Sequence, residues 1–274
     1  MAVQNSINTN PGVFVALRTL NSVNRELDTV QNRVSTGLKV TGALDDASNF
    51  AIAQGIRGEL KAIGAVTQGL NNAKGIGQVA LAGTTGLSNL LTDVRSKLTE
   101  LSNEGLTAEQ RTILTDDFNQ LLSQAGNFID NAVFNGVNLI DSGGADVNTL
   151  SNLNGGTLTL TTQDLRTDTA SLAGVTPTTA AAAQNAIANE FANLEATVNT
   201  ALGSLGAEVR ALNLQTTFLE EISDATEEGL GNIVDADLAR ESARLTSLQV
   251  QQQLSTQTLG IANQRPQSLL GLFR

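Results

Sequence analysis

Apolar residues recur every seven positions along most of this chain, with a second apolar row three or four positions away from the first. In the first forty residues the two rows are Val13, Leu20, Leu27, Val34 and Ala16, Val23, Val30, Gly37. This spacing places one apolar stripe along an α-helix and is typical of coiled coils. We expect a helix capped by Asn8 or Asn10, with Pro11 in its first turn and Gly37 at its end.

A second apolar pattern begins after Asp45 and Asp46, either of which could cap a helix, and continues to about Asn103. Its two rows are Ile56, Ile63, Leu70, Gly77, Thr84, Leu91, Leu98 and Val66, Ala73, Ala80, Leu87, Val94, Leu101. Only Gly77 and Thr84 interrupt them. A continuous helix of this length would measure roughly 85 Å at ~1.5 Å per residue. Its many glycines weaken it in isolation, so we expect closely packed helical neighbours.

A third helix is predicted after Thr107, because Gln110 stands three residues later in the spacing of a capping box. It ends at "FNGVNLID". Residues 141–179 are rich in Gly, Ser, Thr, Asn and Asp, and the alternation in "GGTLTLTTQDL" predicts a strand. We expect this strand to be half of a hairpin that follows "NGVNLI".

Helical spacing returns in two further rows, Phe191, Val198, Leu205, Leu212, Leu219 and Ile187, Leu194, Ala201, Glu208, Gln215, Ile222. "EEGLGN" interrupts the pattern, a last helix is predicted from about Asp235, and Pro266 is expected to kink or end it. The order of elements is symmetric about the middle of the chain. It predicts an elongated all-α fold, an antiparallel bundle of long helices with paired termini and a small β-hairpin-containing insert at the far end.

Composition agrees with thin helical packing, since only 3% of the residues are aromatic and there is no Trp or Tyr. The net charge is −11 and no run of three basic residues occurs, which argues against nucleic acid or membrane partners. Cys and His are absent, so thiolate nucleophiles, His bases and Cys/His metal sites are excluded. Adjacent acidic pairs point to different sides of a helix, so we expect no enzyme activity and no cofactor.

The N-terminus lacks the basic and apolar blocks of a secretory signal peptide, and no apolar stretch is long enough to span a membrane. These signals alone would place the protein in the cytoplasm by default.

Several blocks of the sequence resemble bacterial flagellins. "STGLKVTGALDDASNFAIA" is similar to their N-terminal signature, "VFNGVNLI" to the end of an inner helix, and "IVDADLARESARLTSLQVQQQLSTQTLGIANQRPQSLLGLFR" to their C-terminal region. The resemblance covers about residues 1–140 and 180–274. The short middle segment is similar to the reduced outer domain of small alphaproteobacterial flagellins.

The resemblance implies an extracellular filament subunit that self-assembles into a helical polymer for swimming motility. It assigns 1–42 and 233–274 to the terminal coiled coil D0, 43–140 and 180–232 to the helical rod D1, and 141–179 to an outward-facing insert. It also implies export without a cleaved signal peptide. The implied partners are the export apparatus, an export chaperone, the filament cap and the hook-junction proteins.

We expect one set of residues to form the intrachain coiled coil and the polymerisation interface: Val13, Leu20, Leu27, Val34, Leu238, Leu245, Leu248, Leu259, Leu269, Leu272 and Phe273. Val94, Arg95 and Leu98 fall in the region that resembles an innate-receptor motif, but Ser96-Lys97 replaces its acidic residue, so receptor activation is not expected. Two other functions remain open from the sequence. These are a hook–filament junction protein and a soluble coiled-coil scaffold or adhesin.

Overall fold

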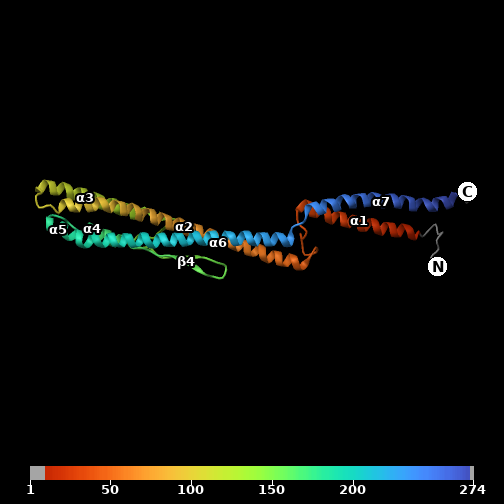
Figure 1. Ribbon diagram of the computed structural model, residues 1–274, viewed down its shortest axis with the longest axis horizontal. Coiled ribbons are helices and arrows are strands. Elements are labelled where there is room, and N and C mark those ends of the chain that lie inside the picture. The colour runs from red at the N-terminus through yellow and green to blue at the C-terminus, as the bar shows by residue number, and fades with distance from the viewer. Residues whose placement is uncertain (1–9, 272–274) are drawn as a thin grey trace. The chain divides into compact units, whose positions relative to one another are not determined.

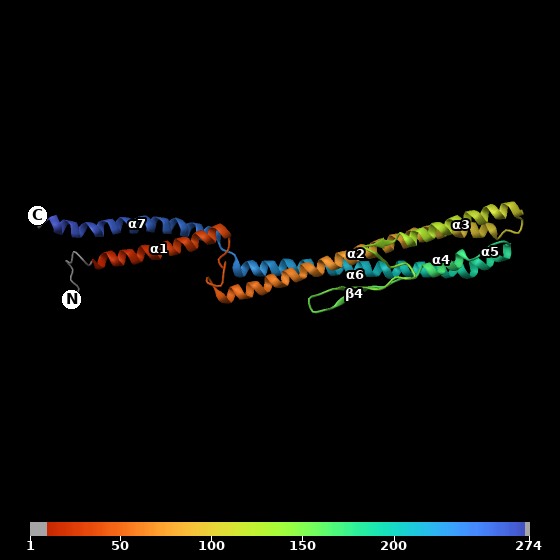
Figure 2. The same ribbon diagram turned by 180° about the vertical axis from the view of Figure 1, so that it is seen from behind.

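The computed structural model describes residues 10–271, with side chains described through Gln264. Helices dominate (Figures 1 and 2), so the all-α class is confirmed. The elements are α1 (Pro11–Thr36), α2 (Ala47–Leu101), α3 (Ala108–Asp130), β1 (Val133–Phe134), β2 (Val137–Asn138), β3 (Val147–Leu150), β4 (Thr157–Leu160), α4 (Arg166–Ala173), α5 (Ala180–Ala186), the π-helical turn η1 (Ile187–Phe191), α6 (Ala192–Val234) and α7 (Leu238–Gly271).

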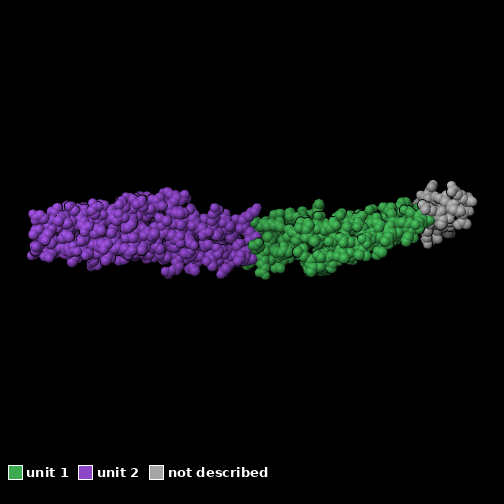
Figure 3. Space-filling model, turned by 90° about the horizontal axis from the view of Figure 1, so that it is seen from above, with its two compact units in different colours: residues 1–58, 225–274 green, residues 59–224 purple. Residues whose placement is uncertain are grey.

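The chain divides into two compact units, which Figure 3 distinguishes by colour. Unit 1 comprises residues 1–58 and 225–274, and unit 2 comprises residues 59–224. The expected insert, 141–179, belongs to unit 2 together with most of α2 and α6.

Helix α1 begins and ends where its local sequence predicts. The side chain of Asn10 accepts hydrogen bonds from the backbone N–H groups of Gly12 and Val13. Pro11 is the first helical residue, where its missing N–H costs nothing. Gly37 ends the helix with a φ of 74°, a left-handed conformation that favours glycine.

Asp45 and Asp46 have different structural roles at the start of α2. Asp46 caps the helix by accepting hydrogen bonds from the N–H groups of Ser48 and Asn49, at 3.1 and 3.0 Å. Asp45 instead closes the preceding loop, where it accepts from the hydroxyl and N–H of Thr41 and from the N–H of Gly42. These hydrogen bonds from Thr41 hold the pKa of Asp45 below its ordinary value.

Helix α2 is continuous from Ala47 to Leu101, as its apolar rows predict, and the two interruptions of those rows have structural reasons. A Cβ atom at Gly77 would lie 2.7 Å from a methyl group of Val209, so only glycine permits this approach of α6. Thr84 is fully buried and donates its hydroxyl proton to the carbonyl oxygen of Ala80. Both residues therefore belong to the core face of α2.

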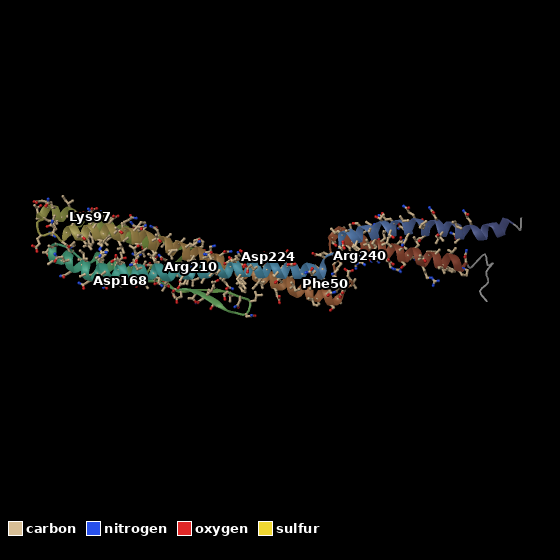
Figure 4. The ribbon with its side chains drawn as sticks, viewed as in Figure 1. Phe50, Lys97, Asp168, Arg210, Asp224 and Arg240 are labelled. Atoms are coloured by element: carbon tan, nitrogen blue, oxygen red, sulfur yellow. The ribbon has the colours of Figure 1, made fainter. Side chains whose placement is uncertain are left out.

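The core of unit 2 is one cluster of thirty buried apolar residues. Helices α2, α3 and α6 contribute most of them, and Phe118 and Phe191 are the largest fully buried side chains. Helix α3 begins with the expected capping box, in which Thr107 and Gln110 each accept a hydrogen bond from the other's backbone N–H. Lys97 near the end of α2 pairs with Asp117 of α3 at 3.2 Å (Figure 4).

The predicted hairpin after "NGVNLI" is confirmed, since β4 (157–160) pairs antiparallel with β3 (147–150). A second, shorter hairpin, β1–β2, precedes it and was not predicted. Asn135 and Gly136, with φ of 50° and 79°, close this hairpin as a two-residue turn. An Asn-Gly pair between two apolar runs is the sequence signal for such a turn.

The position of the insert also differs from the expected one at the end of the bundle. The β3–β4 hairpin lies along α2 and α6 (Figure 1), with Thr149 beside Gly69 and Leu160 beside Gly77. At the end of unit 2 lies the α2–α3 turn, where Gln184 of α5 donates to the carbonyl oxygen of Ser102. The insert also contains an additional helix, α4, whose Asp168 accepts a hydrogen bond from Thr197 of α6 (Figure 4).

Two predicted helix boundaries are wrong. Helix α6 continues through "EEGLGN" to Val234, because a helix tolerates an isolated glycine at a cost of about 1 kcal/mol when its neighbours pack. Helix α7 continues through Pro266 to Gly271, so the predicted end at Pro266 is wrong, while the alternative of a kink there stays a prediction. Proline already has a helical φ, so a helix can pass through it after losing one hydrogen bond and adjusting one carbonyl group.

Candidate assembly interface

In unit 1, α1 and α7 lie side by side in opposite directions (Figures 1 and 2). Each helix turns a stripe with 3-4 spacing toward the other, and every residue of the two stripes is buried or half-buried. The stripes are Val13, Ala16, Leu20, Val23, Leu27, Val30, Val34 on α1 and Glu241, Leu245, Leu248, Gln252, Ser255, Leu259, Ala262 on α7. This is the seam of a two-helix coiled coil.

The centre of the seam is apolar and small. Val23, Leu27, Val30 and Leu248 form its buried cluster. Val34 and Leu245 pack against this cluster from one side. Toward the chain ends the α7 stripe becomes polar at Gln252 and Ser255, and the residues there are only half-buried.

Polar contacts along the seam fix the antiparallel direction. Arg33 pairs with Glu241 and Glu26 with Arg244, at 3.3 and 3.4 Å. Farther along, Gln252 donates to the side-chain oxygen of Asn24 at 2.8 Å. At the far end, the amide of Asn10 donates to the carbonyl oxygen of Ala262.

The two helices meet at a short backbone junction in the same unit. The N–H of Lys39 donates to the carbonyl oxygen of Val234 at 2.7 Å, and the N–H of Ala236 donates to that of Gly37 at 2.8 Å. Val40, Ala53 and Val234 form a small buried cluster beside these hydrogen bonds. The junction therefore sets where α1 and α7 begin to pair.

Large apolar side chains remain exposed on the faces of both helices that the seam does not use. The exposed fraction is 55% at Phe14, 55% at Leu254 and 66% at Ile261. Leu17 and Val250 are exposed as well. Val250, Leu254 and Ile261 follow helical spacing on the side of α7 opposite the seam. Unit 1 thus presents an apolar outer surface in addition to its internal seam.

The structure places the predicted interface residues in several environments. Leu27 and Leu248 are buried, and Val34 and Leu245 pack against them. Val13, Leu20 and Leu259 are half-buried on the same seam.

Leu238 lies off the seam and is exposed, because it falls one turn before the first seam residue, Glu241. Leu269 lies in α7 with its side chain outside the described residues, and Leu272 and Phe273 lie outside them altogether. Val23 and Val30, which the sequence places in the companion row, were not singled out although they form half of the buried cluster.

The expected receptor region lies in unit 2 and is mostly inaccessible. Val94 and Leu98 are fully buried core residues, so only Arg95 reaches the surface. Its guanidinium lies 5.5 Å from the ring centre of Phe191 and pairs with Glu195 at 3.3 Å. Neighbouring side chains therefore already engage the one exposed residue of the three.

Among the described residues, no three acidic side chains gather in an arrangement that could hold a metal ion. Nor does any described helix combine the length and apolar character that crossing a membrane requires.

A long coiled-coil seam, exposed apolar helix faces and a helical core are typical of a structural protein. The N-terminal helical region of bacterial flagellin matches residues 7–144, and the C-terminal helical region of flagellin matches residues 193–273. The chain belongs to the bacterial flagellin family. Members of this family are structural proteins that polymerise into the extracellular flagellar filament, and this chain is such a filament subunit.

Two flagellins match nearly the whole chain, and one solved structure matches part of it. The chain is 38% identical to flagellin FljK of Caulobacter vibrioides, over 98% of this chain and 99% of the relative. It is 34% identical to a flagellin of Brucella melitensis, again over 98% and 99%. The crystal structure of Bacillus cereus flagellin is 20% identical and covers 65% of this chain and 94% of its own, with a TM-score of 0.38.

Proposed function

We propose that α1 and α7 form the core domain of the filament, with their outer apolar faces completed by neighbouring subunits. The observation that supports this is the row of large exposed side chains, Phe14, Leu17, Val250, Leu254 and Ile261, opposite or beside the internal seam. Apolar surface of this kind on helices marks a protein interface. The resemblance to flagellins also assigns Leu269, Leu272 and Phe273 to contacts with neighbouring subunits in this proposal, although their side chains lie outside the described residues.

Assembly is coupled to folding in this proposal. The seam buries few residues, and a helix with one thinly packed face is marginal in water. Burial against neighbours supplies the free energy that offsets the entropy of ordering both helices. A chain with incompletely ordered ends also suits passage through a narrow export channel.

Family membership supports the remaining assignments of this proposal. Residues 1–42 and 233–274 form the core domain, 43–140 and 180–232 the rod, and 141–179 the outward-facing segment. The chain leaves the cell without a cleaved signal peptide, through the flagellar export apparatus and with an export chaperone. At the filament it meets the cap and the hook-junction proteins.

Deletion of Gln251–Arg274 is the first test. It removes Leu254, Leu259 and Ile261, so both the outer half of the seam and the outer stripe of α7 are lost. We expect no filaments, assayed by electron microscopy of sheared cell-surface material, while immunoblots measure export separately. Normal filaments from this truncated chain would overturn the proposal.

A point variant separates the outer face from the seam. Leu254→Asp places a charge on the exposed stripe without touching the seam and is expected to abolish or shorten filaments. Gln249→Asp is the matched control, since Gln249 is exposed on the same helix but lies off this stripe. Equal filament yield from both variants would assign no assembly role to the outer face.

Two other functions have less support. A hook–filament junction protein usually has a larger middle region, whereas this chain matches filament flagellins over 98% of its own length and 99% of theirs. A soluble scaffold does not require exposed apolar stripes on its terminal helices, whereas this chain has them. The abundance of the protein distinguishes a filament subunit from a junction protein. A filament subunit is the main band in sheared filaments, whereas a junction protein is scarce.

A further inference from the structure

The net charge of −11 resides entirely in unit 2. Unit 2 has eighteen acidic and seven basic residues, while unit 1 has nine of each. Copies of unit 2 packed side by side in a filament therefore repel one another. A contact between two such units is favoured at surfaces that carry no charge, and two uncharged apolar features of unit 2 are left exposed by the described part of the chain.

The first feature is a groove between the β3–β4 hairpin and α2. The hairpin is fixed to α6, because the amide of Gln215 donates to the carbonyl oxygen of Ser151 and the carboxylate of Glu208 accepts from Thr161. On its other side, a groove of about 510 Å³ separates it from α2. None of its lining residues is charged, and they include Ala62, Ala65, Gly69, Leu150 and Leu153.

The floor and rim of this groove suit an apolar side chain. Ala62, Ala65 and Gly69 on α2 are small and leave the floor open. Leu150 and Leu153 on the hairpin are about half exposed at its rim. An apolar group that entered the groove would bury these leucines at the same time, which is favourable because apolar surface is removed from water.

The second feature is a pair of large apolar side chains on α6. Leu214 and Phe218 lie one turn apart, with 67% and 53% of their surfaces exposed. The buried residues of this part of α6, Val209, Leu212 and Leu219, lie on the opposite face of the helix by its 3.6-residue period. Leu214 and Phe218 do not line the groove of their own chain.

We propose that Leu214 and Phe218 of one copy insert into the groove of a second copy. The proposal rests on the polymerisation of this chain and names a contact between its acidic units. A projection and a recess on different surfaces of one molecule give a heterologous contact, which propagates from copy to copy and suits a helical polymer. Both partners are uncharged, so the contact avoids the repulsion between the surrounding acidic surfaces.

The absence of cysteine from the sequence allows a direct test by crosslinking. Phe218→Cys combined with Ala65→Cys places one thiol on the projection and one on the groove floor of every subunit. Filaments of this double variant, mildly oxidised and run on a non-reducing gel, are expected to give a ladder of covalent multimers. The matched control combines Phe218→Cys with Ser171→Cys, a conservative change at an exposed residue of α4, and is expected to give no ladder.

Filaments without a ladder, an equal ladder in the control, or a crosslink to a different protein would each overturn the contact. A charge variant gives a second measurement. Phe218→Asp is expected to reduce filament yield at least tenfold relative to Ser171→Asp, while the thermal unfolding of the monomer is unchanged because Phe218 is exposed. If Phe218→Asp assembles normally while deletion of 251–274 abolishes assembly, this contact is wrong and the proposed role of the terminal helices stands.

Discussion

The two units of this chain bury their helices to very different extents. Unit 2 has a cluster of thirty buried apolar residues, whereas the described part of unit 1 has clusters of four and three. Unit 1 also leaves large apolar residues of both terminal helices exposed. Because most helix stability comes from packing an apolar face, unit 2 is expected to fold by itself and unit 1 to depend on neighbouring subunits.

The two units also differ in net charge. Unit 1 is electrically neutral, and its ion pairs, such as Arg33–Glu241, lie between its own helices. Unit 2 carries all of the net negative charge. A neutral apolar surface favours association, whereas an acidic surface favours solubility and limits contacts to a few uncharged places. One chain thus combines a unit suited to assembly with one suited to remaining in water.

The largest effect is expected from the unit 2 core. Phe118→Ala removes a fully buried ring and is expected to lower the free energy of unfolding by about 3–5 kcal/mol. Urea unfolding followed by circular dichroism measures this change. Leu27→Ala is the comparison in unit 1, and is expected to leave that transition unchanged. Equal shifts from both variants would show that the two units do not unfold separately.

A pair of glycine variants on α2 tests how closely unit 2 packs. A Cβ atom at Gly83 would lie 2.8 Å from that of Ala132 and 3.0 Å from Ile140, so Gly83→Ala is expected to destabilise by about 1–3 kcal/mol. A Cβ atom at Gly64 would have no neighbouring side chain within 4 Å, so Gly64→Ala is expected to stabilise the helix by up to ~1 kcal/mol. Thermal melting of the two variants should move in opposite directions, and a shared direction would contradict the close packing at Gly83.

The N-terminal cap of α1 tests the dependence of unit 1 on assembly. Asn10→Ala removes the hydrogen bonds to Gly12 and Val13 and the contact with Ala262, at a cost of about 1 kcal/mol. We expect this loss to lower the temperature at which filaments dissociate and to leave monomer unfolding unchanged. Asn21→Ala, an exposed asparagine on the same helix, is the control. A lower monomer melting temperature would indicate that α1 is already stably folded before assembly.

The smallest effect concerns an ion-pair network in unit 2, where Arg166 of α4 contacts both Asp130 and Asp141. The hydrogen bond from Arg166, 2.7 Å long, holds the pKa of Asp141 below its ordinary value. A carboxylate with a lowered folded-state pKa stabilises the fold above its unfolded pKa of about 4, and this contribution is lost as pH falls through the folded value.

Arg166→Gln is therefore expected to cost about 1 kcal/mol near neutral pH, and less below pH 4. Melting temperatures from pH 7 down to pH 3 measure this difference, with Lys61→Gln, which removes an exposed positive charge of the same unit but none of its described ion pairs, as the control. A gap between wild type and Arg166→Gln that stays constant down to pH 3 would contradict the role of Asp141.

Local features of the fold were predicted correctly because short stretches of chain decide them. The Asn10 cap, the Gly37 end of α1 and the Thr107–Gln110 capping box each depend on residues within four positions. The rows of apolar residues likewise predicted the length of α2 and the stripe of α1. Glu208 and Gln215 interrupt an apolar row of the sequence. Their side chains hold the β3–β4 hairpin through hydrogen bonds, a role that residue spacing does not predict.

The sequence by itself determined the helices, their apolar faces and the family of this protein, because side-chain period and local capping follow from neighbouring residues. Only the tertiary structure decided which strand pairs with 157–160, where the hairpin lies on α2 and α6, and that Leu238 faces solvent while Val23 is buried. These features depend on which residues distant in sequence approach one another. That choice is made by complementary packing and by turn geometry, neither of which a periodic pattern specifies.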